Sequence, residues 1–131
     1  MITIIATKAT KQLNAAYKTV YRKDSLPVLT HFHIYTQDKM LIVESTNLEN
    51  ASREKIDCRV ENEINLCVPA RAFKDWMAVI AKSYNKTQQI VFFANSTELY
   101  AVITEDGCKS KTHFHGMSSA DFPNIDKLLP N

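Results

Sequence analysis

The same order of strand-like and helix-like segments occurs twice in this chain, and this repetition restricts the possible folds more than any other sequence feature. Each copy begins with a short β-rich run, continues with an amphipathic helix and ends in alternating strands. Ile2–Val20 matches Ile64–Tyr84 in pattern rather than identity, with an offset of about 62–64 residues. The sequence therefore predicts an α+β fold of two βαβββ repeats, with two helices packed on an antiparallel sheet, in a single domain over residues 1–131.

The first predicted helix, Lys8–Tyr21, separates apolar from basic side chains. Thr7 is its expected N-cap, because a threonine hydroxyl accepts hydrogen bonds from backbone N–H groups of a first turn. Lys8, Lys11 and Lys18 fall on the face opposite the apolar stripe. Pro27 prevents the helix from continuing, since proline restricts its own backbone and that of the preceding residue. The apolar stripe is formed by Ala9, Leu13, Ala16, Tyr17 and Val20.

A second helix with the same division of side chains is predicted after Pro69, whose missing N–H suits the first turn of a helix. Arg71 and Lys82 lie opposite its apolar stripe, and Lys74 lies on the flank. Both helices therefore turn basic faces outward, and packing them side by side on a sheet produces one positive surface. The apolar stripe is formed by Phe73, Trp76, Met77, Ile80 and Tyr84.

The other segments alternate as strands separated by polar turns. Turns are predicted at Asp38-Lys39, Asn95-Ser96-Thr97 and Glu105-Asp106-Gly107, and the last two close hairpins. The predicted strands are Ile2–Ala6, Val28–Thr36, Met40–Ser45, Asn50–Val60, Ile64–Val68, Gln89–Ala94, Leu99–Thr104 and Cys108–His115.

Positive charge is concentrated in one part of the chain, although the formal net charge is only +2. Residues 8–24 contain five basic side chains, among them Arg22 and Lys23, against the single acid Asp24. Residues 38–63 contain four basic and seven acidic side chains. The asymmetry singles out the first helix and the loop after it as the basic segment.

Composition excludes several classes of protein. Two glycines, Gly107 and Gly116, cannot form a dinucleotide-binding turn or a P-loop. No apolar run is long enough to span a membrane, and the start of the chain lacks the pattern of a secretory signal. Three cysteines without a C-x-x-C pair predict reduced thiols in a cytoplasmic protein. These cysteines are Cys58, Cys67 and Cys108.

The histidines form two i, i+2 pairs, His31 with His33 and His113 with His115, so each pair projects from one face of its strand. Four imidazoles would bind zinc if the pairs converged, but no acidic or cysteine ligand lies at a recognised spacing. We therefore predict ordinary strand histidines, with no metal, no cofactor and no catalytic residue. A metal-dependent enzyme that uses these histidines is the alternative.

Four short motifs resemble the N-terminal domain of the bacterial sliding clamp family, the beta subunit of DNA polymerase III. The resemblance covers essentially the whole chain. It implies a non-enzymatic processivity factor of bacterial replication, cytoplasmic and nucleoid-associated, without contact with a membrane. The motifs are Ser25-Leu26-Pro27-Val28-Leu29, Glu44-Ser45-Thr46-Asn47-Leu48-Glu49, Val68-Pro69-Ala70-Arg71 and Ala120-Asp121-Phe122-Pro123-Asn124.

The resemblance also implies a ring around duplex DNA, with helices that line the hole and sheets that form the outer wall. The implied partners are duplex DNA, the replicative polymerase and the clamp loader. Matching through Leu26-Pro27 places Lys23 at a DNA-contacting basic position of the family, and Arg71 falls on the basic position of its motif. The expected DNA-binding residues are Lys8, Lys11, Lys18, Arg22, Lys23, Arg71, Lys74 and Lys82.

The predicted strand 108–115 corresponds to the edge that joins the next subunit of the ring. Lys109 and Lys111 match basic positions there and are expected to face acidic partners. Alternatively, both lysines prevent edge-to-edge aggregation of an exposed strand. Asn47 replaces an acidic residue that is usual in its motif.

A family chain has three domains, whereas this sequence ends about where a second would begin. It is thus expected to be either the first domain of a longer chain or a stand-alone clamp-like protein. The family's pocket for polymerase and loader peptides lies in its later domains. The alternative function is a clamp-like protein-interaction domain that does not contact DNA.

Overall fold

Helices and strands follow one another in the predicted order in a computed structural model that describes residues 1–20, 26–84 and 86–129. The helices are α1 (Ala6–Tyr17) and α2 (Ala70–Ser83). Short 3-10 turns are η1 (Pro27–Thr30), η2 (Ser119–Asp121) and η3 (Asp126–Leu128). The strands are β1 (Ile2–Ile5), β2 (His31–Gln37), β3 (Met40–Thr46), β4 (Ala51–Asp57), β5 (Arg59–Val60), β6 (Asn65–Pro69), β7 (Gln89–Ala94), β8 (Glu98–Glu105) and β9 (Cys108–His115).

The described strands divide between two antiparallel sheets, with the orders β5-β1-β7-β8-β9 and β4-β3-β2-β6. The first strand of each repeat pairs within the sheet of the other repeat, since β1 pairs with β7 and β6 pairs with β2. Neither repeat therefore completes a sheet by itself. The predicted α+β class and its two βαβββ repeats are confirmed, with two sheets in place of a single one.

The two sheets separate at Cys58, two residues before the end of the strand predicted over Asn50–Val60. Before this residue β4 pairs with β3, whereas after it β5 pairs with β1 of the other sheet. A continuous alternating pattern gives no signal for such a change of partner, because both halves retain period-two alternation.

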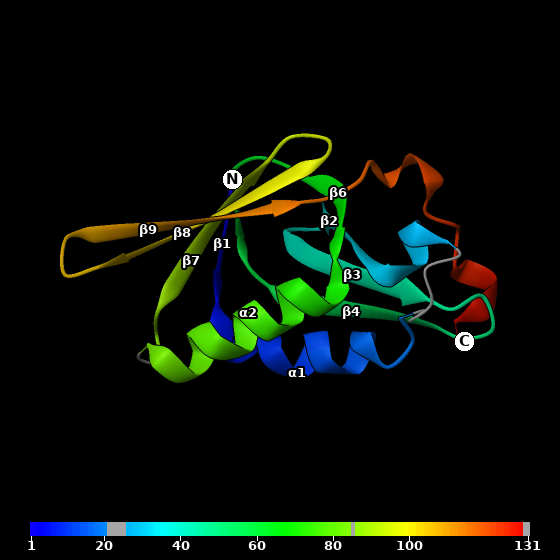
Figure 1. Ribbon diagram of the computed structural model, residues 1–131, viewed down its shortest axis with the longest axis horizontal. Coiled ribbons are helices and arrows are strands. Elements are labelled where there is room, and N and C mark those ends of the chain that lie inside the picture. Colours follow the sequence, from blue (N-terminus) through cyan, green and yellow to red (C-terminus); the bar gives the residue numbers. More distant parts are fainter. Residues whose placement is uncertain (21–25, 85, 130–131) are drawn as a thin grey trace.

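The helices lie side by side against the sheets, and the hydrophobic core fills the space between them (Figure 1). Leu13 of α1 and Met77 of α2 have no exposed surface. Phe73 of α2 contacts Phe92 of β7 and Phe114 of β9, with ring centroids 5.9 and 5.4 Å apart. The predicted apolar stripes therefore form the inner faces of both helices.

Three hydroxyl groups attach the end of α1 to the sheet beneath it. The Thr19 hydroxyl lies 2.5 Å from that of Ser45 and donates to that of Ser52 at 3.1 Å. Ser45, which is fully buried, donates to the Ala16 carbonyl at 2.5 Å. These bonds satisfy the buried Ser45 hydroxyl and two half-buried hydroxyls beside it, and an unpaired buried hydroxyl is costly.

Several predicted boundaries are wrong. The first helix begins at Ala6 directly after β1, so Thr7 lies within its first turn and is not the N-cap; the Thr7 hydroxyl donates to the Lys86 carbonyl. The helix ends at Tyr17, and Tyr21, its predicted last residue, lies outside the described residues. Pro69 ends β6 and is the N-cap of α2.

The strand predicted over Val28–Thr36 begins only at His31, because Pro27 starts a 3-10 turn. The Thr30 hydroxyl closes that turn by donating to the Pro27 carbonyl at 2.7 Å. The predicted Asp38-Lys39 turn is confirmed: both residues have positive φ, 52° and 63°, as a two-residue hairpin loop requires.

Gly116, directly after β9, is required by a close approach of two backbones. A Cβ at this position would lie 2.1 Å from the carbonyl oxygen of Cys67. The neighbouring Met117 forms a β-bridge with Cys67, which ties the end of β9 to β6 of the other sheet. Neither helix in the described residues has the length and apolar content that crossing a membrane requires.

Candidate nucleic-acid interface

Six basic side chains of α1 and α2 form what we call the cationic helix face. On α1, Lys8 and Lys11 are exposed, and Lys18 is exposed at its C-cap. On α2, Arg71 and Lys82 are exposed and Lys74 is half-buried. Each set is carried by a helix whose opposite side is buried in the core, so the positive charges lie on the outside of the helix layer.

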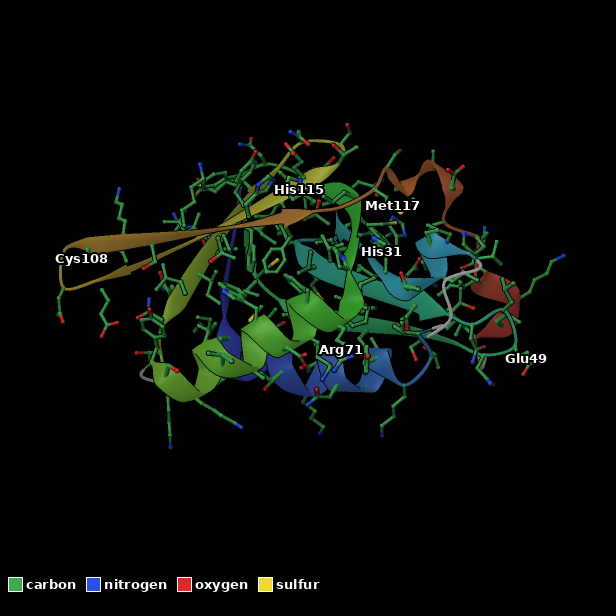
Figure 2. All side chains as sticks on the ribbon, in the orientation of Figure 1. His31, Glu49, Arg71, Cys108, His115 and Met117 are labelled. Atoms are coloured by element: carbon green, nitrogen blue, oxygen red, sulfur yellow. The ribbon has the colours of Figure 1, made fainter. Side chains whose placement is uncertain are left out.

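Figure 2 shows where this face lies in the molecule. Arg71 is labelled at the beginning of α2, on the helix side, whereas His115 and Cys108 are labelled on β9. Because α1 and α2 contact each other, the basic residues of both repeats lie on one layer of two adjacent helices. The two helices thus bring together charges that are about 60 residues apart in the sequence.

Negative charge is almost absent from the two helices: over their described residues, Asp75 is the single acidic side chain. Arg71 Nε lies 3.8 Å from Asp75 Oδ2, and the Arg71 side chain is 83% exposed. An exposed ion pair of this kind contributes little free energy. The Arg71 guanidinium therefore remains available to an external anion.

Lys74 differs from the other basic residues of the face. Its ammonium lies 3.0 Å from Asp75 Oδ1 and 4.8 Å from the centre of the Tyr17 ring on α1. These contacts place the side chain between the two helices, with 22% of it exposed. Lys74 therefore stabilises the helix pair in addition to adding positive charge.

The arrangement suits phosphate groups rather than base edges. Lysine ammonium groups act as point charges that neutralise phosphates and release condensed counterions. Such contacts position a duplex without recognising its sequence. Arg22 and Lys23, the two predicted DNA-binding residues of the loop after α1, lie outside the described residues.

Lys109 and Lys111 lie on β9, the last strand of its sheet, which pairs with β8 on one side. Both side chains are exposed. The Lys111 ammonium lies 4.6 Å from the centre of the Tyr100 ring and 6.0 Å from that of Phe93. Lys111 therefore has aromatic partners within its own sheet, as a cation–π contact.

A buried carboxylate on the four-stranded sheet is a site that sequence analysis did not find. Glu44 of β3 is 5% exposed, and its Oε2 accepts hydrogen bonds from Tyr35 at 2.8 Å and from Arg53 at 2.6 Å. Its Oε1 lies 3.2 Å from His33 Nδ1. Arg53 also donates to Asp126 of η3 at 2.6 Å, so the cluster attaches the C-terminal segment to the sheet.

Strand register is the signal that could have found this cluster. Once the Asp38-Lys39 turn is recognised, His33 falls opposite Glu44, and Arg53 of the next strand falls opposite the same residue. The His33 imidazole, the Glu44 carboxylate and the Arg53 guanidinium therefore lie in one row across three neighbouring strands.

We predict that Glu44→Gln makes the free energy of unfolding less dependent on pH in the acidic range. Burial alone raises the Glu44 pKa, but hydrogen bonds from His33, Tyr35 and Arg53 outweigh it and hold the pKa below its ordinary value of 4.5. The unfolded chain then takes up a proton before the folded chain does, so this stabilisation is present above about pH 4.5 and is lost as pH falls further.

Urea unfolding between pH 7 and pH 3 measures this effect. At pH 7 the variant is expected to lose about 1–3 kcal/mol, because charge-assisted hydrogen bonds are replaced by neutral ones. Glu49→Gln, in the exposed loop after β3, is the matched control and should leave the pH profile unchanged. Parallel pH profiles for wild type and Glu44→Gln would contradict the prediction.

The two histidine pairs have separate partners. His31 Nδ1 lies 2.8 Å from the Pro27 carbonyl oxygen, and His33 belongs to the Glu44 cluster. His113 and His115 both lie beside Glu98 of β8, at 3.3 and 3.5 Å. Sequence spacing shows no acidic ligand beside either pair, but strand pairing places Glu44 opposite His33 and Glu98 opposite His115.

The cysteines are free thiols. Cys67 is buried, and burial raises its pKa to about 12. Burial also raises the pKa of the half-buried Cys58. Neither thiol is therefore activated as a nucleophile, since reactivity requires the thiolate.

Two helices with an outward basic face pack on two antiparallel sheets, and each sheet contains strands of both repeats. This arrangement defines a DNA-clamp type of domain. The chain belongs to the family of the DNA polymerase III beta subunit, N-terminal domain, which it matches over residues 1–126.

Solved structures of clamps share this fold. The DNA polymerase III subunit beta from Pseudomonas aeruginosa has a TM-score of 0.80 and 22% identity, over 96% of this chain and 32% of that one. Pol III beta from Caulobacter crescentus has a TM-score of 0.80 and 14% identity, over 95% and 32%. The beta subunit from Thermotoga maritima has a TM-score of 0.75 and 17% identity, over 95% and 32%.

The chain thus spans about a third of the length of these proteins. A comparison with curated protein sequences gave no match.

Proposed function

We propose that this chain is a sliding-clamp domain that contacts duplex DNA through the cationic helix face, without sequence specificity. One observation carries the proposal: five exposed basic side chains lie on two adjacent helices that have Asp75 as the single acid among their described residues. The five residues are Lys8, Lys11, Lys18, Arg71 and Lys82. Lys74, Arg22 and Lys23 complete the proposed DNA-binding set.

The mechanism is electrostatic and requires no catalytic residue. Ammonium and guanidinium groups neutralise phosphates along the duplex, and each contact releases counterions. Because backbone phosphates repeat regularly, contacts of equal strength form at every register, which lets a clamp move along DNA. We propose a non-enzymatic processivity domain over residues 1–131 that acts in the bacterial cytoplasm on nucleoid DNA, together with a replicative polymerase and a clamp loader.

Encirclement of DNA requires more than one copy of such a domain. The edge of β9, at the end of its sheet, supports strand-to-strand pairing with a neighbouring subunit of a ring. Lys109 and Lys111 are exposed on this strand, so acidic side chains of the neighbour are their proposed partners. Both lysines also discourage pairing with an identical basic edge.

Fluorescence anisotropy with labelled 25-base-pair duplexes of two unrelated sequences tests the function. Equal binding of both duplexes at low salt is expected, with an affinity that falls steeply as salt rises. With five phosphate contacts, the slope of log K against log salt is about −4.5. Absence of binding at low salt would favour the alternative, a clamp-like protein-interaction domain that does not contact DNA.

A further inference from the structure

Three metal-ligating side chains converge on the outer surface of the β8–β9 hairpin. His113 Nε2 lies 3.3 Å from Glu98 Oε1, and His115 Nδ1 lies 3.5 Å from the same oxygen. All three ligand atoms lie within 4.8 Å of one another. Glu98 is opposite His115 in the strand register, and His113 is two residues along the same strand, so the backbone brings the three together.

These distances are those of a zinc site before the metal enters. Zinc binds imidazole nitrogen and carboxylate oxygen at about 2.0–2.2 Å, so neighbouring ligand atoms of a tetrahedral site are about 3.4 Å apart. Both His–Glu separations match this value. The remaining pair of nitrogens must move closer together, which the His115 ring permits because its side chain is 81% exposed.

The ligands are held in place by a surrounding set of contacts. The other carboxylate oxygen of Glu98, Oε2, accepts hydrogen bonds from Tyr100 at 3.1 Å and from Asn95 at 3.4 Å. This leaves Oε1 directed at the histidines. The His113 ring stacks on Tyr100 with centroids 4.4 Å apart and planes inclined by 11°. Partners of this kind fix the orientation of metal ligands and raise metal affinity.

The donor set selects the metal. Two imidazoles and one carboxylate suit zinc and other late transition metals, whereas calcium and magnesium prefer sites made of oxygen alone. From this geometry we propose that Glu98, His113 and His115 bind one zinc ion, with a fourth position open to water. The ion lies between the two imidazoles and the Glu98 carboxylate in place of their direct contacts, and the ring protons then lie on the nitrogens that face away from it.

Zinc binding at this position connects β8 to β9, the last strand of the sheet among the described residues. Its effect is to stabilise the hairpin, since a ligand that binds only the folded state raises stability. The site lies on β8 and β9 and uses none of the basic residues of α1 and α2, so it is independent of the proposed contact with DNA.

Isothermal titration calorimetry, in which zinc chloride is added to the reduced protein, tests the proposal. We expect one zinc per chain, and a rise in the unfolding temperature as zinc is added. Glu98→Gln and His113→Ala should each weaken binding by at least about tenfold. In the double variant His113→Ala/His115→Ala, both the heat of zinc binding and the rise in unfolding temperature should disappear. This variant retains all three cysteines, so zinc held by thiols would persist in it.

Two controls make the outcome specific. His31→Ala removes one histidine of the other i, i+2 pair, and zinc affinity should not change. Lys111→Ala removes a charge from the same strand without removing a ligand, so binding should persist or become tighter. Equal zinc binding by wild type and the double histidine variant would overturn the proposal, as would loss of binding in His31→Ala.

Discussion

Reversing three charges of the cationic helix face, with Lys11→Glu, Lys18→Glu and Arg71→Glu together, is expected to weaken binding of duplex DNA by at least about 100-fold at low salt. Each substitution removes one basic group that neutralises a phosphate and adds a repulsive charge at an exposed position. The slope of log affinity against log salt should become shallower by about 0.9 for each phosphate that is no longer neutralised. Fluorescence anisotropy with an arbitrary duplex, repeated at several salt concentrations, measures both quantities.

A control with the same net charge separates the position of these residues from total charge. Lys39, Lys55 and Lys127 are exposed and lie outside α1 and α2. Reversing these three to glutamate changes the net charge equally and should reduce affinity by less than about threefold. If the two triple variants lose affinity to the same extent, bulk charge explains binding and the helix face has no special role.

Phe73→Ala is expected to lower the free energy of unfolding by about 3–5 kcal/mol. Phe73 is 1% exposed and contacts aromatic rings on β7 and β9, so truncation leaves a cavity between α2 and the sheet. This loss is a large share of the total free energy of unfolding, because a domain of this size has a stability of about 5–15 kcal/mol. Urea denaturation at neutral pH measures the loss.

Val79→Ala on the same helix is the matched control, because its side chain is 58% exposed. We expect it to change stability by no more than about 0.5 kcal/mol. A decrease of less than about 1 kcal/mol in Phe73→Ala would contradict the placement of α2 over the five-stranded sheet, because truncating a ring buried there must leave a cavity.

The helices and their basic faces could be predicted because helical periodicity is a local property of the sequence. Leu13 and Met77 fall at the centres of their stripes and are fully buried, and the lysines opposite them are exposed. Hairpin turns could be predicted equally well, because Asp38-Lys39 and Asp106-Gly107 adopt the positive φ values that short loops need. Each of these signals is contained within a few neighbouring residues.

The division into two sheets could not be predicted, because it depends on which strands pair rather than on which residues form strands. The change of partner at Cys58 leaves the alternation of side chains intact. The clusters around Glu44 and Glu98 were missed for a related reason. Each joins residues of adjacent strands, so it becomes visible only when turn positions are converted into strand register.

The beginning of the first helix shows how tertiary structure overrides a local signal. Thr7 is a good N-cap by residue type, yet Ala6 is buried at the junction with β1 and the helix starts there. The Thr7 hydroxyl instead bonds to the Lys86 carbonyl, between α2 and β7. Contacts between residues that are distant in sequence thus fix the start of the helix at Ala6, whereas local propensity predicts a start at Lys8.

The central claim is that α1 and α2 present a single surface to DNA, and mapping of amide chemical shifts tests it most directly. Protein labelled with nitrogen-15 is titrated with a duplex of arbitrary sequence at low salt. We expect the perturbed amides to cluster around Lys11, Lys18, Arg71 and Lys82, with changes on both helices that follow one binding curve. Perturbations confined to β9 or to the outer surface of the four-stranded sheet would contradict it.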